Sequence, residues 1–91
     1  MEVCAKMIVK GRVQGVGFRW FVQQRAKKFG VSGYVRNLDN GDVGIEAEGE
    51  RGRVEELIKS VKVGPTFSKV VDIVIEWQKF TGKYDSFNTT F

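Results

Sequence analysis

The sequence contains no histidine among its 91 residues. This absence removes the side chain that most often serves as a general base or as a metal ligand. Both glycine-rich signatures of nucleotide sites are also missing, because neither GxGxxG nor GxxxxGKS/T occurs. Any chemistry performed by this chain is therefore expected to proceed without histidine and without a nucleotide loop.

Cysteine and long apolar runs are equally scarce. The single cysteine, Cys4, cannot close an internal disulfide, which fits a reducing compartment. With no histidine to activate it, Cys4 is expected to contribute packing and not chemistry. Lys6 and Lys10 interrupt the apolar residues near the amino terminus, so neither a secretion signal nor a membrane span is indicated. We expect a cytoplasmic protein that forms one domain over residues 1–91.

The charges are unevenly distributed along the chain. Residues 1–37 contain eight Lys or Arg and only one acid, Glu2, whereas the remaining residues contain seven basic and ten acidic side chains. A positive half of this kind raises the local concentration of small anions, although it also attracts nucleic acid nonspecifically. The first half of the chain is thus the place to look for an anion site.

A glycine-rich turn in that half follows a strand-like segment and precedes a helix-like one. Gly15 and Gly17 can adopt positive φ and let successive backbone N–H groups point into one concavity. The free N–H groups and the positive dipole end of the next helix add to the same site. Arg19 follows directly, and its planar fork of donors suits a phosphoryl group. The alternative is that these glycines only make a tight connection.

The pattern of apolar residues predicts a βαββαβ order. Alternation predicts strands, and apolar residues at i, i+3 and i+4 predict helices, with Gly30 as the expected end of the first helix. Asp39-Asn40-Gly41-Asp42 lies between two alternating runs and predicts a hairpin. The expected elements are a strand over 3–10, a helix over 18–29, strands over 32–38 and 43–48, a helix over 54–61, a strand over 70–77 and a short edge strand over 84–87.

This order is typical of the ferredoxin-like split βαβ fold of the α+β class, an antiparallel sheet of four or five strands with two helices on one face. The first two strands then run in the same direction with the third between them. Their carboxyl ends lie at one edge of the sheet, roughly 10 Å apart. Asn37, near the end of the second strand, is therefore expected to face the same pocket as Arg19. Taken alone, Asn37 is also a typical turn residue.

Two stretches of the sequence resemble the acylphosphatase family. The first is residues 9–19, VKGRVQGVGFR, and the second is residues 33–37, GYVRN, followed by Gly41, Val43 and Gly49. The resemblance covers nearly the whole chain and is weakest after Lys79. It implies a small cytosolic monomer that hydrolyses acyl phosphates to a carboxylate and inorganic phosphate, without metal or cofactor.

The resemblance also implies roles for individual residues. Arg19 corresponds to a catalytic arginine that binds phosphate, and Asn37 to the residue that holds the nucleophilic water. The phosphate-binding backbone amides are those of Gln14, Gly15, Val16, Gly17, Phe18 and Arg19. The side chain of Gln14 could donate to the anion or brace the loop. The small-molecule acyl phosphate is then the substrate, inorganic phosphate is a product and weak inhibitor, and neither nucleic acid nor membrane is an expected partner.

The remaining polar and aromatic residues indicate less. Arg36 should point to the other face of its strand. Phe18 and Trp20 could form a stacking platform, but aromatic residues at helical spacing more often lie in the core. The acids Glu46, Glu48, Glu50, Asp72 and Glu76 fall at outward positions, so catalysis by paired carboxylates is not expected. The rival interpretation is a noncatalytic RNA- or phosphate-binding module of the same fold, although Gly44, Glu46 and Glu48 stand where an RNA-binding sheet has aromatic and basic residues.

Overall fold

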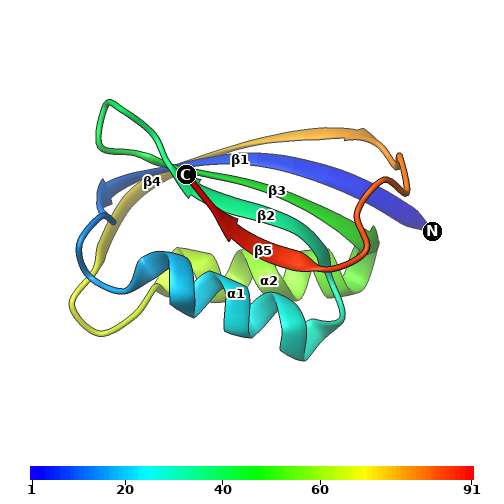
Figure 1. Cartoon of the computed structure of the whole chain (residues 1–91), viewed down its shortest axis with the longest axis horizontal. Coiled ribbons are helices and arrows are strands. Elements are labelled where there is room, and N and C mark those ends of the chain that lie inside the picture. Colours follow the sequence, from blue (N-terminus) through cyan, green and yellow to red (C-terminus); the bar gives the residue numbers. More distant parts are fainter.

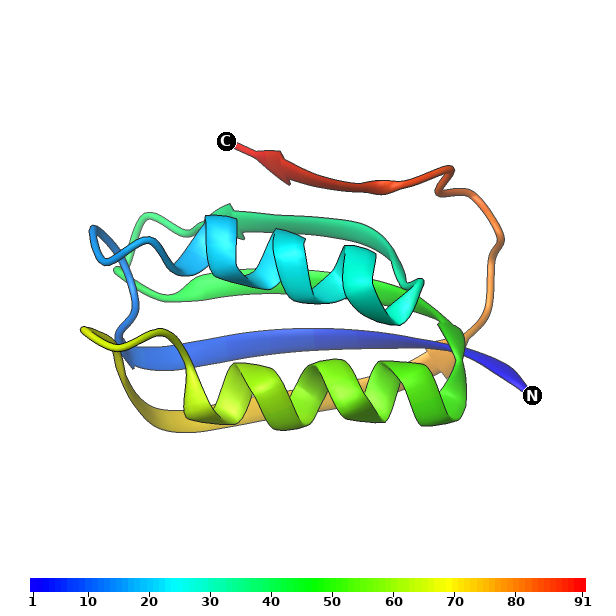
Figure 2. The same ribbon diagram turned by 90° about the horizontal axis from the view of Figure 1, so that it is seen from below.

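The computed structural model describes residues 1–91 and consists of a five-stranded sheet with two helices on one face (Figures 1 and 2). The strand order is β4-β1-β3-β2-β5. The elements are β1 (Glu2–Arg12), α1 (Phe18–Phe29), β2 (Ser32–Asn37), β3 (Val43–Glu50), α2 (Arg51–Val63), β4 (Lys69–Lys79) and β5 (Phe87–Thr90). The predicted βαββαβ order and ferredoxin-like fold are confirmed.

The core lies between the sheet and the two helices. Alternation along β1 places Val3, Ala5, Met7 and Val9 in this layer, where all four are buried. Both helices contribute buried residues at helical spacing: Phe18, Val22 and Ala26 from α1, and Val54, Leu57, Ile58 and Val61 from α2. The α1 helix ends at Gly30, whose left-handed conformation (φ 69°) lets its N–H bond back to the helix.

The β2–β3 hairpin is the one that Asn-Gly predicts. Asn37 pairs with Val43, and the turn between them is closed by the Leu38 N–H, which donates to the Asp42 carbonyl at 2.8 Å. The Asn40 side chain accepts from the Asp42 N–H at 3.0 Å, and Gly41 has φ 96°. This turn follows Asn37 directly and fixes the end of β2.

Three expectations from the sequence are wrong in detail. The first strand continues to Arg12, with an irregularity in its pairing to β4 between Lys10 and Gly11, so both Gly11 and Arg12 belong to the strand and not to the turn. The edge strand covers Phe87–Thr90 instead of residues 84–87. It pairs with β2 in parallel, so the sheet is mixed and not purely antiparallel.

The sequence predicts outward positions for the two acids Glu46 and Glu48 of β3. They do alternate with the core residues Ile45 and Ala47, but they are only 6% and 1% exposed. Residues after β4 cross this face of the sheet and contact both carboxylates, as described below. Alternation therefore predicts the face of the sheet correctly, and the burial comes from residues far along the chain.

The topology brings three strand ends together. Both β1 and β2 pair antiparallel with β3, and β5 runs parallel to β2, so the carboxyl ends of β1, β2 and β5 lie at one edge of the sheet. The loop after β1 and the start of α1 lie at this edge (Figure 2).

Neither helix has the length and apolar character needed to cross a membrane.

Candidate active site

A pocket of about 330 Å³ opens at this edge of the sheet. Its nine lining residues come from the loop after β1, the first turns of α1, the end of β2 and β5: Val13, Gly15, Gly17, Phe18, Arg19, Trp20, Gln23, Asn37 and Thr89. Arg19 is the only ionisable side chain among them, so the pocket carries a positive charge with no acid to neutralise it. Such a pocket favours an anion.

The loop over residues 13–17 has the backbone conformation that its glycines suggest. Gly15 and Gly17 have φ 73° and 76°, in the left-handed region, and a Cβ at either position would meet only open space. Glycine is therefore needed here for backbone conformation and not because a neighbour crowds the position. Gly17 is also the residue before α1, and no side chain caps this helix.

The backbone N–H groups of the loop have no acceptor inside the protein. None of the backbone N–H groups of residues 14–17 donates a hydrogen bond to a backbone carbonyl or to a side chain. No acidic residue occupies the first turn of α1 either. Unpaired N–H groups at a helix start, together with the helix dipole, form a good binding site for phosphate-like anions.

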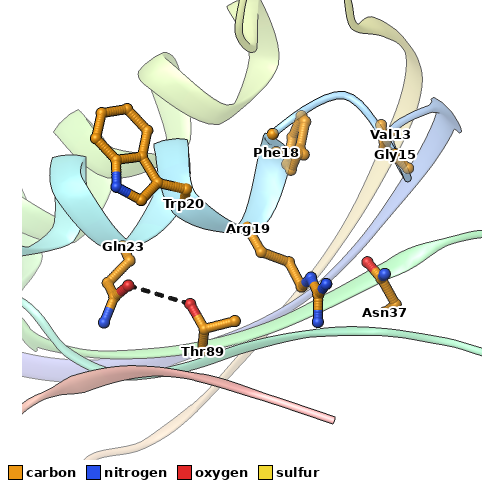
Figure 3. A pocket seen from close by; sticks show the side chains of 9 residues that line it. Val13, Gly15, Phe18, Arg19, Trp20, Gln23, Asn37 and Thr89 are labelled. Atoms are coloured by element: carbon orange, nitrogen blue, oxygen red, sulfur yellow. Dashed lines mark hydrogen bonds between the residues drawn. The ribbon is translucent and has the colours of Figure 1, made fainter.

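Arg19 and Asn37 face each other across the pocket (Figure 3). Arg19 comes from the first turn of α1, and Asn37 is the last residue of β2. The Oδ1 atom of Asn37 is buried and accepts no hydrogen bond from any protein group. Buried acceptors without a partner are rare, because they lose their contact with water and gain nothing in return. This oxygen is therefore available to a donor that enters with a ligand.

The side chain of Gln14 braces the loop and does not line the pocket. Its Nε2 donates to the carbonyl of Leu38 and to that of Asp42, both at 2.8 Å. These bonds tie the loop after β1 to the turn that follows Asn37. Of the two roles considered for this side chain, the structure therefore shows the brace. Val16 also lies outside the lining residues and packs against the core.

The carboxyl-terminal residues contact Arg19, a role that no motif in the sequence indicates. The Arg19 guanidinium donates to the carbonyl of Thr90 at 3.5 Å and lies 5.7 Å from the centre of the Phe91 ring. The neighbouring Thr89 hydroxyl donates to Gln23 at 3.2 Å (Figure 3). Because β5 lies beside β2 only through long-range pairing, these contacts could not be found from local patterns.

The two aromatic residues beside Arg19 have different environments. Phe18 is 2% exposed and belongs to the core, as its helical spacing suggests. Trp20 is 67% exposed at the rim of the pocket and points away from Arg19, so the core position considered for it is wrong (Figure 3). Arg36 is exposed and lines a different hollow, on the other face of the sheet.

Nothing in the described chain is arranged as a metal site, since no group of three or more His, Cys, Asp or Glu side chains could hold an ion. The pocket instead offers one guanidinium, several free amide donors and one free carbonyl acceptor. Such a set can bind a phosphoryl dianion and position one small donor molecule beside it.

Comparison with known proteins agrees with this geometry. The acylphosphatase family model matches residues 5–89. An acylphosphatase of Bacillus licheniformis is 44% identical over 86 residues, which cover 94% of this chain and 96% of that protein. An acylphosphatase of Geotalea uraniireducens is 43% identical over 91 residues and the full length of both chains. The crystal structure of acylphosphatase from Bacillus subtilis superposes with a TM-score of 0.95 at 40% identity, covering 98% of this chain and 99% of that one.

Proposed function

Because the chain belongs to the acylphosphatase family, we propose that the pocket between Arg19 and Asn37 is where it performs the reaction of that family. The enzyme hydrolyses the bond between a carboxyl group and a phosphate, and releases a carboxylate and inorganic phosphate. One observation carries the assignment of the site. The guanidinium of Arg19, the unpaired backbone amides of Gly15 and Gly17, and Asn37 with its unpartnered Oδ1 line one pocket.

Arg19 and the backbone amides of residues 14–18 bind the phosphoryl group in this proposal. Phosphoryl transfer mainly requires alignment and stabilisation of charge on the three equatorial oxygens. A single well-placed arginine contributes roughly 10³ to 10⁵ in rate to such reactions. The amides add donors that are already oriented and lose no side-chain freedom when the substrate binds.

Asn37 positions the attacking water. Its carboxamide is neutral and cannot remove a proton at pH 7, but its free Oδ1 can accept a hydrogen bond from water. The water oxygen forms a bond to phosphorus while the bond from phosphorus to the acyl oxygen breaks. The proton of the water passes to a phosphoryl oxygen of the substrate, so the products are a carboxylate and dihydrogen phosphate. No protein base is needed for this step.

No general acid is needed either, because the leaving group is a carboxylate. Its conjugate acid has a pKa near 4, so it departs as an anion at neutral pH. An alkyl phosphate ester would leave as an alkoxide and would require a proton that no group in this pocket can supply. Such esters are therefore expected to be poor substrates.

The proposal extends to the wider properties of the protein. We expect residues 1–91 to act as one domain, as a monomer in the cytoplasm, with inorganic phosphate as a weak competitive inhibitor. Neither a metal nor a cofactor takes part in the proposed reaction, and nucleic acid is not a partner.

The direct test is hydrolysis of a simple aryl acyl phosphate, such as benzoyl phosphate, with and without a chelator. The proposal predicts full turnover in the presence of the chelator and competitive inhibition by inorganic phosphate. Turnover that depends on an added metal would contradict it. Absence of turnover together with tight, salt-sensitive binding of single-stranded RNA would instead support the binding module.

A further inference from the structure

A second polar cluster lies on the face of the sheet away from the helices. Glu48 of β3 is its centre, and although no helix covers it, this carboxylate is only 1% exposed. Its Oε2 accepts from the Thr81 N–H at 2.8 Å and from the Thr81 hydroxyl at 2.7 Å. Its Oε1 accepts from the Gly82 N–H at 3.0 Å. We call Glu48, Thr81 and Gly82 the latch.

The latch holds the segment that carries the chain from one edge of the sheet to the other. Residues 80–86 connect β4, the outer strand on one side of the sheet, to β5, the outer strand on the other side. They cross at the end of the sheet away from the pocket (Figure 2). Glu46 supports the same segment, because its Oε1 accepts from the Tyr84 hydroxyl at 2.8 Å and lies 3.5 Å from the Lys83 ammonium. The segment has no helix or strand of its own, so side-chain bonds of this kind fix its path.

The segment leads directly into the strand that contacts Arg19. The Ser86 carbonyl accepts from the Gly33 N–H at 3.0 Å, and β5 then pairs with β2 over four residues only. At its end, Thr90 and Phe91 contact the Arg19 guanidinium. A four-residue strand at a sheet edge is a weak element by itself. Its position depends on Phe87 in the core, on the bonds that join Gln23 of α1 to Phe87 and Thr89, and on the segment that precedes it.

We propose that Glu48 is a positioning residue for the active site: it anchors residues 80–86, and through them holds β5 where Thr90 and Phe91 orient the Arg19 guanidinium. The proposal rests on the role of Arg19 in binding the phosphoryl group. Glu48 itself touches no substrate, since it lies on the other face of the sheet and does not line the pocket. A displacement of about 1 Å at a reacting group is enough to lower rates up to about 100-fold, so a distant anchor can matter.

The test uses Glu48→Gln with Glu50→Gln as its control. The amide NH₂ of glutamine would face at least one of the three donors from which Glu48 now accepts hydrogen bonds. At least one hydrogen bond of the latch would therefore be lost. We expect KM for benzoyl phosphate and the inhibition constant of inorganic phosphate to rise about fivefold to tenfold. Glu50, which is exposed and contacts only the terminal amine of Met1, should tolerate the change.

This readout separates positioning from a loss of folded protein. Partial unfolding lowers the apparent kcat in proportion to the folded fraction but leaves KM and the inhibition constant unchanged. A second pair of variants keeps the carboxylate in place. Thr81→Val removes the hydroxyl, which donates to Glu48 and also accepts from the Lys83 N–H at 3.3 Å, and should give an intermediate rise in both constants. Thr81→Ser retains the hydroxyl and should behave like the original protein.

Hydrogen exchange at the amides of Thr89, Thr90 and Phe91 completes the test. In Glu48→Gln these amides should exchange faster, while those of β1 should not change. Unchanged constants in Glu48→Gln would overturn the proposal, whether or not exchange at β5 is faster. This failure differs from failure of the proposed function, which would appear as an undiminished affinity for phosphate in Arg19→Ala.

Discussion

The pocket and the latch are the two polar centres of this small protein, and they differ in how far their hydrogen bonds are satisfied. In the pocket, the amides of Gly15 and Gly17 and the Asn37 Oδ1 have no partner within the protein. In the latch, Glu48 accepts three hydrogen bonds and is almost inaccessible to solvent. Polar groups without partners therefore mark where a ligand binds, and fully paired groups mark where the fold is held together.

The electrostatics of the two centres differ in the same way. The pocket contains one cation and no acid. Around the latch, burial by itself would raise the pKa of Glu48, but the hydrogen bonds from Thr81 and Gly82 lower it below its ordinary value. Burial and the two nearby carboxylates raise the pKa of the Cys4 thiol to about 11. Cys4 is thus a packed thiol, as expected from the lack of histidine.

The largest effect should come from Arg19→Ala. Removing the only cation of the pocket should lower kcat/KM for benzoyl phosphate by about 10³ or more. The melting temperature should hardly change, because the guanidinium makes only a long bond to Thr90 and a ring contact. The matched control is Arg36→Ala, on the other face of the sheet, which should keep full activity. Comparable losses of kcat/KM in the two variants would contradict the placement of the active site in the pocket that Arg19 lines.

The next largest effect should come from Asn37→Ala. In the proposed mechanism Asn37 orients the water, so its loss should lower kcat by about 10² to 10³, a magnitude found when one oriented polar group is removed from other sites. Inorganic phosphate should still inhibit with a similar constant, because the amides and Arg19 remain. Asn88→Ala, an exposed change in β5, serves as control. If kcat and phosphate affinity fell together, Asn37 would shape the loop instead of holding water.

A smaller effect is expected for Gln14→Ala, which tests whether the loop needs its brace. The change removes two hydrogen bonds and leaves two carbonyls without that donor, so unfolding should become easier by about 1–2 kcal/mol. Activity should fall about tenfold, since the loop amides lose their fixed direction. Urea unfolding and initial rates measure both. As a control, Gln78→Ala, at an exposed site on β4, should change neither the unfolding free energy nor the activity. A stable and fully active Gln14→Ala would show that the loop is rigid without its brace.

The smallest effect concerns the response of the latch to acid. Because the pKa of Glu48 is lower in the folded protein than its ordinary value of 4.5, its contribution to stability is fully present above about pH 4.5. That contribution is lost as the pH falls through the lower, folded-state pKa. Urea midpoints at pH 7 and pH 3 should therefore differ less in Glu48→Gln than in the original protein. An equal difference in both proteins would mean that Glu48 is not paired as described.

Local patterns were sufficient to predict the order of the helices and strands. Alternation in β1, helical spacing after Phe18 and the Asn-Gly turn each report on neighbours in the sequence. The order of the elements also predicts that the carboxyl ends of the first two strands lie together, and Arg19 and Asn37 line one pocket at these ends.

Most features missed by sequence analysis depend on contacts between distant residues. The parallel pairing of β5 with β2 joins Gly33 to Phe87, and no local pattern specifies it. Glu48 has the sequence context of an exposed residue and is buried only because Thr81 and Gly82 cross it. Trp20 is a different case, because it lies two residues from both Phe18 and Val22 and so falls on the side of α1 away from the core, at the pocket rim.

The account depends most on the claim that the loop amides, Arg19 and Asn37 bind one phosphoryl group together. Titration of nitrogen-15-labelled protein with inorganic phosphate, followed by NMR, tests this claim residue by residue. The largest shift changes are predicted at the amides of residues 15–18, the Arg19 side-chain N–H and the Asn37 carboxamide, all with one dissociation constant. Changes confined to the opposite face around Arg36 and Lys6, with the loop amides unaffected at saturation, would contradict it.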